Sequence, residues 1–306
     1  MKNGMINVYK EKGYTSHDVV AKLRGIVGQK KIGHTGTLDP DAEGVLPVCL
    51  GRATKLCDML TDKNKIYETV LLLGRTTDTQ DVSGKTLREE NTENLTEEQV
   101  KKCIHEYIGE YEQLPPMFSA LKVNGKKLYE LAREGKEVER ARRKVIIYDI
   151  VIQDIQLPRV WMRVHCSKGT YIRTLCHDIG ADLGTGGCME SLLRTQVGSF
   201  ALKDSLKLSA IEEKAKQDRL EEILLPVDAV FADLPAVKVS QKYERLIYNG
   251  NAFHLKCITE MQDFLDDETV RVYDEKDHFI GIYRFRAEKA EFSIEKMFLD
   301  QEELRG

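Results

Sequence analysis

Apolar residues recur at helical spacing in two segments of the chain. In the first segment they share one face of a 3.6-residue repeat: Val19, Val20, Leu23, Ile26 and Val27. Ser16 is placed to cap this helix and Gly28 to end it. In the second segment, Thr96 and Gln99 have the spacing of a capping box and precede the apolar positions Val100, Cys103, Ile104 and Tyr107. The pattern therefore predicts two amphipathic helices.

Shorter apolar runs predict strands at residues 45–50, 67–73, 144–153 and 160–166. The last two runs are separated by a turn at Pro158, which favours their pairing as an antiparallel hairpin. Asn124 and Gly125 give a tight-turn signal between Leu121 and a helix that we expect to open near Lys127. These segments predict a body of mixed α and β structure.

The pattern changes where Leu234 and Pro235 interrupt the helical spacing of residues 211–225 and short strand-like runs follow. The chain has 306 residues, of which 42% are hydrophobic and 31% are charged. This length is enough for two domains, each with its own core. We therefore predict a first domain at residues 1–232 and a small β domain at residues 233–306.

Charge is distributed unevenly between these two parts. Residues 1–240 contain 36 basic and 35 acidic side chains, residues 241–306 contain 10 and 15, and the net charge is −4. The C-terminal part resembles a small PUA-type β domain in two places: Leu234-Pro235 and Tyr248-Asn249-Gly250. Its acidity departs from that of a module that grips RNA, so a purely structural role stays open.

A basic segment lies at residues 122–144. It contains four glutamates and nine basic side chains, namely Lys122, Lys126, Lys127, Arg133, Lys136, Arg140, Arg142, Arg143 and Lys144. Such an excess would neutralise several phosphates and make nucleic-acid binding strongly salt-dependent. A solvated helix face with glutamate–lysine pairing explains the same residues equally well from composition alone.

Membrane and metal-binding classes find no support in the composition. No apolar run approaches the roughly 18 residues of a membrane span, and Met1-Lys2-Asn3-Gly4 lacks an apolar signal region. Seven cysteines are scattered without a Cys-x-x-Cys pair: Cys49, Cys57, Cys103, Cys166, Cys176, Cys188 and Cys257. We therefore expect a soluble, cytoplasmic protein with reduced thiols and no zinc site.

One aspartate lies in a loop that its neighbours make stiff. Gly33, Gly36 and Gly44 permit backbone angles or close approaches that a β-carbon would forbid, and Pro40 restricts Asp39 to extended geometry. A loop anchored on a buried strand is a frequent place for a catalytic side chain. From composition alone, a surface turn in which the carboxylate bonds local backbone is the commoner explanation.

Two other functions of this loop are excluded by spacing. Asp39, Asp41 and Glu43 imitate the start of a calcium-binding EF-hand, but the last ligand position is occupied by Leu50 instead of glutamate. A phosphate-binding P-loop requires a lysine followed by a hydroxyl residue at a fixed distance, and neither Gly33 nor Gly36 is followed by one.

The same loop is similar to the Gly-His-Thr-Gly-x-Leu-Asp-Pro motif of the TruB family of tRNA pseudouridine synthases. Three further motifs of that family are matched in order: Lys65-Ile66-Tyr67 with Leu73-Gly74 and Thr76-Thr77-Asp78-Thr79; Pro115-Pro116-Met117-Phe118-Ser119-Ala120 with Lys122, Gly125, Leu128-Tyr129 and Ala132-Arg133; and Cys166-Ser167-Lys168-Gly169-Thr170-Tyr171-Ile172-Arg173-Thr174. Together the four motifs cover most of the predicted first domain.

The resemblance implies an α+β catalytic domain of pseudouridine synthase type, with a mixed, largely antiparallel sheet and flanking helices. The implied reaction isomerises uridine to pseudouridine at position 55, in the T-loop of tRNA, without cofactor or metal. The base must leave its stack to be reached. Asp39 would be the ionised nucleophile or base, Tyr67 would stack on the uracil and move the C5 proton, and Arg173 would pair with Asp39.

Further residues are implied to bind the substrate: His34 at the rim, Tyr171, Leu193 as an apolar wall, and the basic residues Lys122, Lys126, Lys127, Arg142 and Arg143. The implied partner is the T-arm stem-loop of tRNA, bound by a monomer away from any membrane. Simpler roles stay open from the residues alone. Tyr67 and Leu193 are also suited to a core, Arg173 to a surface ion pair, and His34 to a hydrogen-bonded loop.

Two functions of other classes share some of these features. Ser119 and Lys122 satisfy the Ser-x-x-Lys pattern of serine acyl-transfer enzymes, although the companion motifs Ser-Asp-Asn and Lys-Thr-Gly are absent. A non-catalytic RNA-binding or RNA-folding protein would share the basic segment but would not need Asp39. Modification of RNA, lost on replacing that aspartate, separates an enzyme from such a binder.

Overall fold

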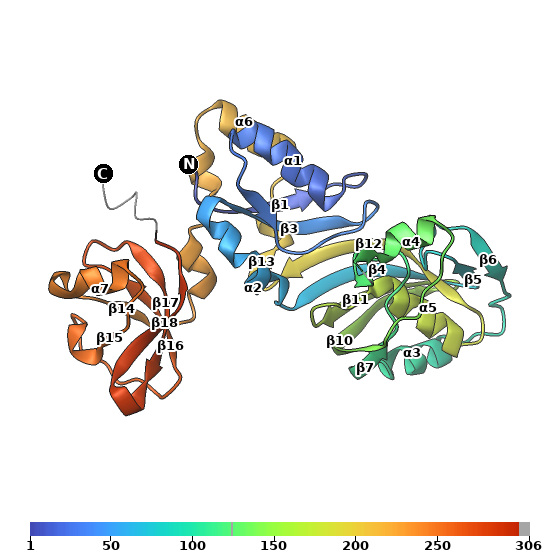
Figure 1. The fold of residues 1–306 in the computed structure, drawn as a ribbon. Helices are drawn as coiled ribbons and strands as arrows, with labels where there is room; N and C mark the ends of the chain where they lie inside the picture. Colours follow the sequence, from blue (N-terminus) through green and yellow to red (C-terminus); the bar gives the residue numbers. More distant parts are fainter. Residues whose placement is uncertain (124, 300–306) are drawn as a thin grey trace.

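Two β-sheets form the frame of the molecule, whose computed structural model describes residues 1–123 and 125–299 (Figure 1). The larger sheet has nine strands. Seven follow one path in the order β1 (Gly4–Lys10), β3 (Glu43–Leu50), β12 (Gly187–Val197), β4 (Lys65–Leu73), β11 (Arg159–Cys166), β10 (Arg143–Gln156) and β7 (Gly109–Gln113). The other two are β2 (Ile32–His34), which pairs with β3, and β13 (Phe200–Ala201), which pairs with β12.

The larger sheet is mixed and largely antiparallel, so the predicted fold class is confirmed. Its pairings are antiparallel except that of β12 with β3, where Arg194 lies opposite Gly44. On its other side β12 pairs antiparallel with β4, and there Arg194 lies opposite Tyr67. Strand β12, which the apolar pattern did not predict, therefore joins the two halves of the sheet.

Helices cover both halves of this sheet, and in each half they form a hydrophobic core together with the strands. Helices α1 (Ser16–Val27) and α6 (Leu208–Lys216) pack on β1 and β3. Helices α3 (Glu97–His105) and α5 (Ile172–Asp182) pack at the other end, on β4, β10 and β11 (Figure 1). The remaining short elements are η1 (Gly51–Leu56), α2 (Cys57–Thr61), β5 (Arg75–Thr77), β6 (Thr86–Glu89), η2 (Leu202–Asp204), η3 (Leu220–Ile223) and η4 (Val227–Phe231).

Both predicted helices form, but one predicted cap is wrong. Thr15, not Ser16, caps α1 and forms a capping box with Asp18. Ser16 is instead fully buried, and its hydroxyl accepts a hydrogen bond from the Leu38 N–H at 2.9 Å. A tertiary contact thus decides between two adjacent hydroxyl residues that are equally good caps. Gly28 ends α1 in the left-handed conformation, and the capping box of α3 is confirmed.

The four predicted strands are confirmed within β3, β4, β10 and β11, and the last two pair as an antiparallel hairpin. Asn124, half of the predicted tight turn, lies outside the described residues. On its two sides β8 (Lys122–Val123) and β9 (Lys126–Lys127) pair antiparallel. Helix α4 (Leu128–Arg133) follows directly, as predicted from the opening expected near Lys127.

The smaller sheet lies in the C-terminal lobe, drawn in orange and red in Figure 1. Its strands follow the order β14 (Ala236–Lys238), β16 (Thr269–Tyr273), β17 (Phe279–Arg286), β18 (Glu291–Met297) and β15 (Phe253–His254), with the short helical elements η5 (Gln241–Tyr243), α7 (Glu244–Tyr248), η6 (Leu255–Cys257) and η7 (Ala287–Lys289). This lobe has its own hydrophobic core. The domain division at residue 232 and the PUA-type assignment stay predictions.

A shared apolar cluster joins the two sheets. Phe231, Ile282 and Phe298 pack in one cluster with Met5 and Val45 of the larger sheet. The helical spacing of residues 211–225 is realised as α6 and η3, which are separated at Asp218 by a positive φ of 55°. None of the helices in the described part of the chain is both long enough and apolar enough to cross a bilayer.

Candidate active site

The structure brings Asp39 and Arg173 together, although 134 positions separate them in the sequence. Arg173 Nε lies 3.0 Å from Asp39 Oδ2, and its Nη2 donates to Asp39 Oδ1 at 3.3 Å. A guanidinium that meets both carboxylate oxygens fixes their orientation in a way that an ammonium does not. The Arg173 side chain is only 5% exposed, so the alternative of a surface ion pair is wrong.

Arg173 also holds two further loops against this carboxylate. Its Nη1 donates to Thr79 O at 3.0 Å, and its Nη2 donates to Phe118 O at 2.8 Å. Nη1 lies 3.7 Å from Oδ2 of Asp81, for which the sequence predicted no role. Asp81 follows the second motif by two positions, and nothing in its immediate neighbours marks it before the fold is known.

The surroundings of Asp39 raise the pKa of its carboxyl group above the ordinary value. The largest cause is burial, which disfavours the charged form, while Arg173 opposes this effect. Asp81 adds to the rise because two negative charges repel each other. The Asp39 side chain is nevertheless 40% exposed. A carboxylate that is oriented by a buried guanidinium is therefore still accessible to a substrate.

Two buried side chains hold the loop that carries Asp39. The Lys10 amine, which is fully buried, donates to the carbonyl oxygen of Ala42 at 2.5 Å. The Ser16 hydroxyl accepts from the Leu38 N–H at 2.9 Å. These anchors come from β1 and from α1, so the alternative of a surface turn bonded only to its own backbone is wrong.

A third anchor is Arg194, for which the sequence predicted no role. Its side chain is fully buried, and its Nε donates to Val45 O at 2.7 Å. Its Nη1 and Nη2 donate to Thr37 O at 3.4 Å and to Gly36 O at 3.3 Å. These carbonyl groups lie on both sides of Asp39 in the sequence.

Tyr67 lies next to this loop on β4. It is buried in one apolar cluster with Leu38 and Ala42, two neighbours of Asp39 in the loop. Burial raises the pKa of the Tyr67 hydroxyl, and the nearby Arg194 guanidinium opposes that rise. The geometry therefore brings the tyrosine to the predicted site, and it also makes the ring part of the core.

His34 ends β2 at the start of the same loop. Its Nδ1 accepts a hydrogen bond from the Gly36 N–H at 3.3 Å, and its ring meets that of His17 edge to face at 5.3 Å. Burial lowers the pKa of His34 to about 4, with contributions from His17 and Arg194. A neutral ring that accepts at Nδ1 carries its proton at Nε2, which leaves one donor on this side chain.

Tyr171 and Leu193 lie on two further elements. Tyr171 precedes α5, and its backbone N–H and C=O are both bonded to the Gln113 side chain, at 2.7 and 2.9 Å. Burial raises the pKa of Tyr171. Leu193 is half-buried on β12, opposite Glu43 on β3 and Glu68 on β4. Tyr171 precedes Arg173 by two positions. Leu193 directly precedes Arg194 on β12, and adjacent residues of a strand place their side chains on opposite faces of the sheet.

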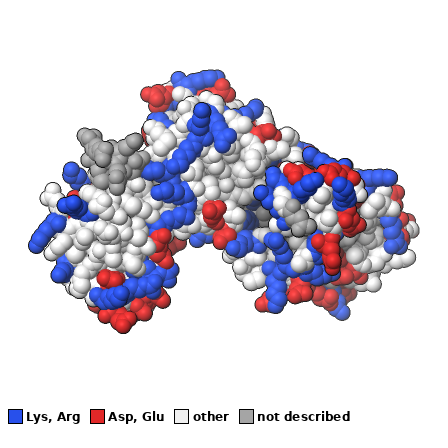
Figure 2. All heavy atoms as spheres, in the orientation of Figure 1, with Lys and Arg blue, Asp and Glu red and all other residues white. Residues whose placement is uncertain are grey.

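The basic residues are not gathered in one place. Lys122 and Lys126 are exposed on the β8–β9 hairpin, and the Lys127 amine lies 5.3 Å from the centre of the Tyr129 ring. Arg143 begins β10. Acidic side chains accompany several of the basic ones: Lys126 and Lys136 lie 3.7 and 2.8 Å from Glu134. Figure 2 shows basic and acidic side chains intermixed over the lobe that carries the hairpin.

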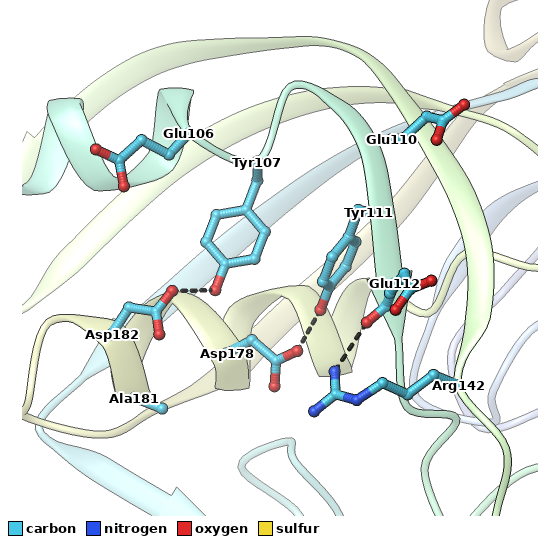
Figure 3. A pocket seen from close by; sticks show the side chains of 9 residues that line it. All are labelled: Glu106, Tyr107, Glu110, Tyr111, Glu112, Arg142, Asp178, Ala181 and Asp182. Atoms are coloured by element: carbon cyan, nitrogen blue, oxygen red, sulfur yellow. Dashed lines mark hydrogen bonds between the residues drawn. The ribbon is translucent and has the colours of Figure 1, made fainter.

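Arg142 lies in a different pocket, which we name the acidic pocket (Figure 3). This cavity has a volume of about 520 Å³ and is lined by Glu106, Tyr107, Glu110, Tyr111, Glu112, Arg142, Asp178, Ala181 and Asp182. Tyr107 donates to Asp182 at 2.7 Å, and Tyr111 donates to Asp178. Arg142 donates to the Glu112 carbonyl at 2.9 Å. Of its lining residues, only Arg142 was predicted to bind the substrate, and no site was predicted here.

The described residues assemble neither a metal site nor an acyl-transfer site. Among residues 1–123 and 125–299, no group of three His, Cys, Asp or Glu side chains would hold a metal ion. Ser119 is buried, its Oγ has no hydrogen-bond partner within the described part of the chain, and Lys122 is exposed. The Ser-x-x-Lys pattern therefore does not produce a serine activated by lysine.

Two protein-family models match adjacent parts of the chain. The TruB family pseudouridylate synthase N-terminal domain matches residues 24–172, and the tRNA pseudouridylate synthase B C-terminal domain matches residues 173–232. The protein named tRNA pseudouridine synthase B of Lachnoclostridium phytofermentans is 52% identical over 307 residues, which cover 97% of this chain and all of the relative. That of Clostridium perfringens strain SM101 is 42% identical over 303 residues, covering 98% and 100%.

Solved structures have the same fold over nearly the whole chain. A Cbf5-Nop10-Gar1 complex contains a chain with a TM-score of 0.73 and 27% identity, and the match covers 98% of this chain and 86% of that one. An H/ACA RNP bound to a substrate RNA containing 2'-deoxyuridine contains a chain with a TM-score of 0.73 at 24% identity, covering 97% and 86%. At 24% identity, the match to the H/ACA RNP chain shows a common fold and no more.

Proposed function

Since this chain belongs to the TruB family of pseudouridine synthases, we propose that it acts on uridine 55, in the T-loop of tRNA, and that Asp39 is its essential carboxylate. The enzyme class follows from the family: the protein is a tRNA pseudouridine synthase, an isomerase that converts uridine in tRNA to pseudouridine. The position in tRNA and the residues that act there are the proposed parts.

The reaction makes specific demands on the protein. The bond between N1 of uracil and C1' of the ribose breaks, the base turns, and C5 bonds to C1' while its hydrogen leaves as a proton. N1 takes up a proton from water in exchange, so the composition of the RNA does not change. The nucleotide must be extruded from its stack, at a cost of a few kcal/mol. A site for this chemistry needs an ionised acid or nucleophile, a wall for the base and a group that handles the C5 proton.

The observation that carries the proposal is the Asp39–Arg173 pair. Its carboxylate is 40% exposed while the guanidinium that orients it is 5% exposed. Fixed geometry of this kind lowers the entropic cost of reaching the reactive arrangement. Arg173 favours the ionised form of Asp39 against the burial that raises its pKa. Attack on the sugar, addition to the base and removal of a sugar proton all remain roles for this carboxylate.

The surrounding side chains suit an extruded uridine. Tyr67 supplies a flat face next to the Asp39 loop and a hydroxyl for the C5 proton. Tyr171 supplies an apolar wall, and His34 offers its one donor at the rim. The exposed lysines of the β8–β9 hairpin, with Arg143, suit the phosphates of the T-arm. We expect a monomer, active in the cytoplasm without metal or cofactor.

Release of tritium tests the proposal. A tRNA transcript with tritium at uridine C5 should lose label to water when the intact enzyme acts, because C5 exchanges its hydrogen for carbon. We expect no release with Asp39→Asn and normal release with Asp41→Asn, which alters an exposed carboxylate two positions away. A transcript with cytidine at position 55 should release no label. Full release by Asp39→Asn would contradict the role of the carboxylate, and release from the cytidine transcript would contradict the position.

A further inference from the structure

Arg194 is a buried cation without an acidic partner. It is 1% exposed, and among the described residues it forms no ion pair. Its hydrogen bonds instead go to three backbone carbonyl oxygens, of Gly36, Thr37 and Val45. Burial of an uncompensated charge costs several kcal/mol. A side chain that is kept at such a cost calls for an explanation beyond filling space.

The position of Arg194 in the sheet connects the parts of the proposed active site. On β12 its backbone lies opposite Gly44 of β3, the strand that follows the Asp39 loop. The contact is so close that a β-carbon on Gly44 would lie 2.2 Å from the Arg194 carbonyl oxygen. On the other side of β12 its antiparallel partner is Tyr67.

The guanidinium spans the two ends of the Asp39 loop. Gly36 and Thr37 precede the aspartate, and Val45 follows it, so the three bonds close the loop across its base. Three carbonyl groups in different directions match the fork of a guanidinium, whereas a lysine presents its donors from a single nitrogen. A shift of about 1 Å at a reacting group is enough to cost about a hundredfold in rate.

We propose that Arg194 is a positioning residue for the isomerisation: its guanidinium fixes the Asp39 loop from both ends, next to its strand partner Tyr67. The inference rests on the proposed role of Asp39. Arg194 touches neither the Asp39 carboxylate nor Arg173 by any hydrogen bond in the described structure, so its effect passes through the backbone. It thus differs from Arg173, which bonds the carboxylate directly.

The test uses Arg194→Lys, which keeps the charge and loses the fork. Lysine is a tolerable residue here, because Lys10 and Lys65 are already buried in the same sheet with their amines on backbone carbonyls. The matched control is Lys65→Met, since Lys65 bonds Thr61 O and Lys63 O, away from the Asp39 loop. Folding of each variant is checked by circular dichroism and thermal melting.

Three measurements are made on each full-length variant: the single-turnover rate of tritium release, the Kd for tRNA, and hydrogen exchange of the backbone in residues 35–45. For Arg194→Lys we expect a rate about a hundredfold lower, a Kd within threefold of the intact enzyme, and faster exchange in that segment. Lys65→Met should melt at a lower temperature with an unchanged rate and unchanged exchange there.

An unchanged rate or unchanged exchange in Arg194→Lys would overturn the inference, as would an equal loss of rate in Lys65→Met. Exchange is measurable whether or not a variant is active, so an inactive protein still gives a decisive result. The proposed function fails separately: either the intact enzyme would release no tritium, or Asp39→Asn would release it normally.

Discussion

Helix α5 contributes charged side chains to two different sites. Arg173, in its first turn, enters the Asp39 site, whereas Asp178 and Asp182 line the acidic pocket (Figure 3). Five and nine residues of an α-helix turn the side chain by about 140° and about 180°. The two sites therefore lie on different faces of one helix, and both contain ionisable groups with shifted pKa values.

The two sites differ in how far their carboxylates remain open to a substrate. In the acidic pocket each aspartate already accepts a tyrosine hydroxyl, and burial raises the pKa of both tyrosines, Tyr107 and Tyr111. Three glutamates on its wall would repel RNA phosphates. In the Asp39 site the carboxylate is oriented by a buried guanidinium and is still open. A sizeable cavity and shifted pKa values alone would select the acidic pocket instead of the site that we propose.

The largest effect that this comparison predicts is on turnover. Arg173→Lys should lower the single-turnover rate of tritium release by about 10²- to 10³-fold, since one ammonium cannot serve Asp39, Thr79 O and Phe118 O together. Binding of tRNA should stay within threefold. On the same helix, Asp178→Asn should leave the rate within twofold. Equal losses in both variants would erase the distinction between the two faces.

A smaller effect is predicted on stability, and it belongs to the acidic pocket. Tyr111→Phe removes the donor to Asp178 and leaves a partly buried carboxylate without that hydrogen bond. We expect a loss of about 1–3 kcal/mol in the free energy of unfolding, measured by urea denaturation, with the rate of tritium release unchanged. Asp182→Asn serves as a control that keeps a hydrogen-bond acceptor for Tyr107. A changed rate in Tyr111→Phe would couple the pocket to catalysis.

The next smaller effect that we predict is a change in the affinity for tRNA. Lys126→Ala should weaken binding by about three- to tenfold at physiological salt and reduce the slope of log affinity against log salt by about one. Lys126 is exposed on the β8–β9 hairpin, with Glu134 3.7 Å away. Glu110→Gln in the acidic pocket should leave the slope unchanged. If the salt slope of Lys126→Ala equals that of the intact enzyme, the hairpin does not contact phosphate.

The features predicted correctly from the sequence are those with local causes. A capping box spans four residues, and an apolar run of six marks a buried strand, so α3 and β3 could be predicted without knowledge of the fold. Asp39 stood out because glycines and a proline stiffen its own loop. Arg173 was assigned to it from a resemblance and not from any local signal.

The features that were missed depend on contacts distant in sequence. Arg194 bonds a carbonyl 158 positions away, and Lys10 bonds one 32 positions away. Neither arginine nor lysine is an expected core residue, and only the completed sheet supplies their acceptors. The Ser16 cap failed for the same reason, because its hydroxyl is bonded to Leu38. Strand β12 needed two neighbours, β3 and β4, to be recognised as central.

The smallest predicted effect concerns the pH dependence of stability, which should have opposite signs for the two sites. The folded protein lowers the pKa of His34 from 6.5 to about 4, so the unfolded chain binds more protons between these values and stability should rise with pH across that window. The full shift corresponds to roughly 3 kcal/mol, and solvent at this part-exposed ring reduces it to about 1 kcal/mol. Urea denaturation at pH 4.5 and pH 7 should show the rise in the intact enzyme and a flatter profile in His34→Gln.

Asp178 has the opposite sign, because its raised pKa favours the protonated fold and its contribution is lost as pH rises. Replacing Asp178 with asparagine should therefore steepen the rise of stability with pH, whereas His34→Gln flattens it. The same change of slope in both variants would contradict the opposite signs of the two pKa shifts.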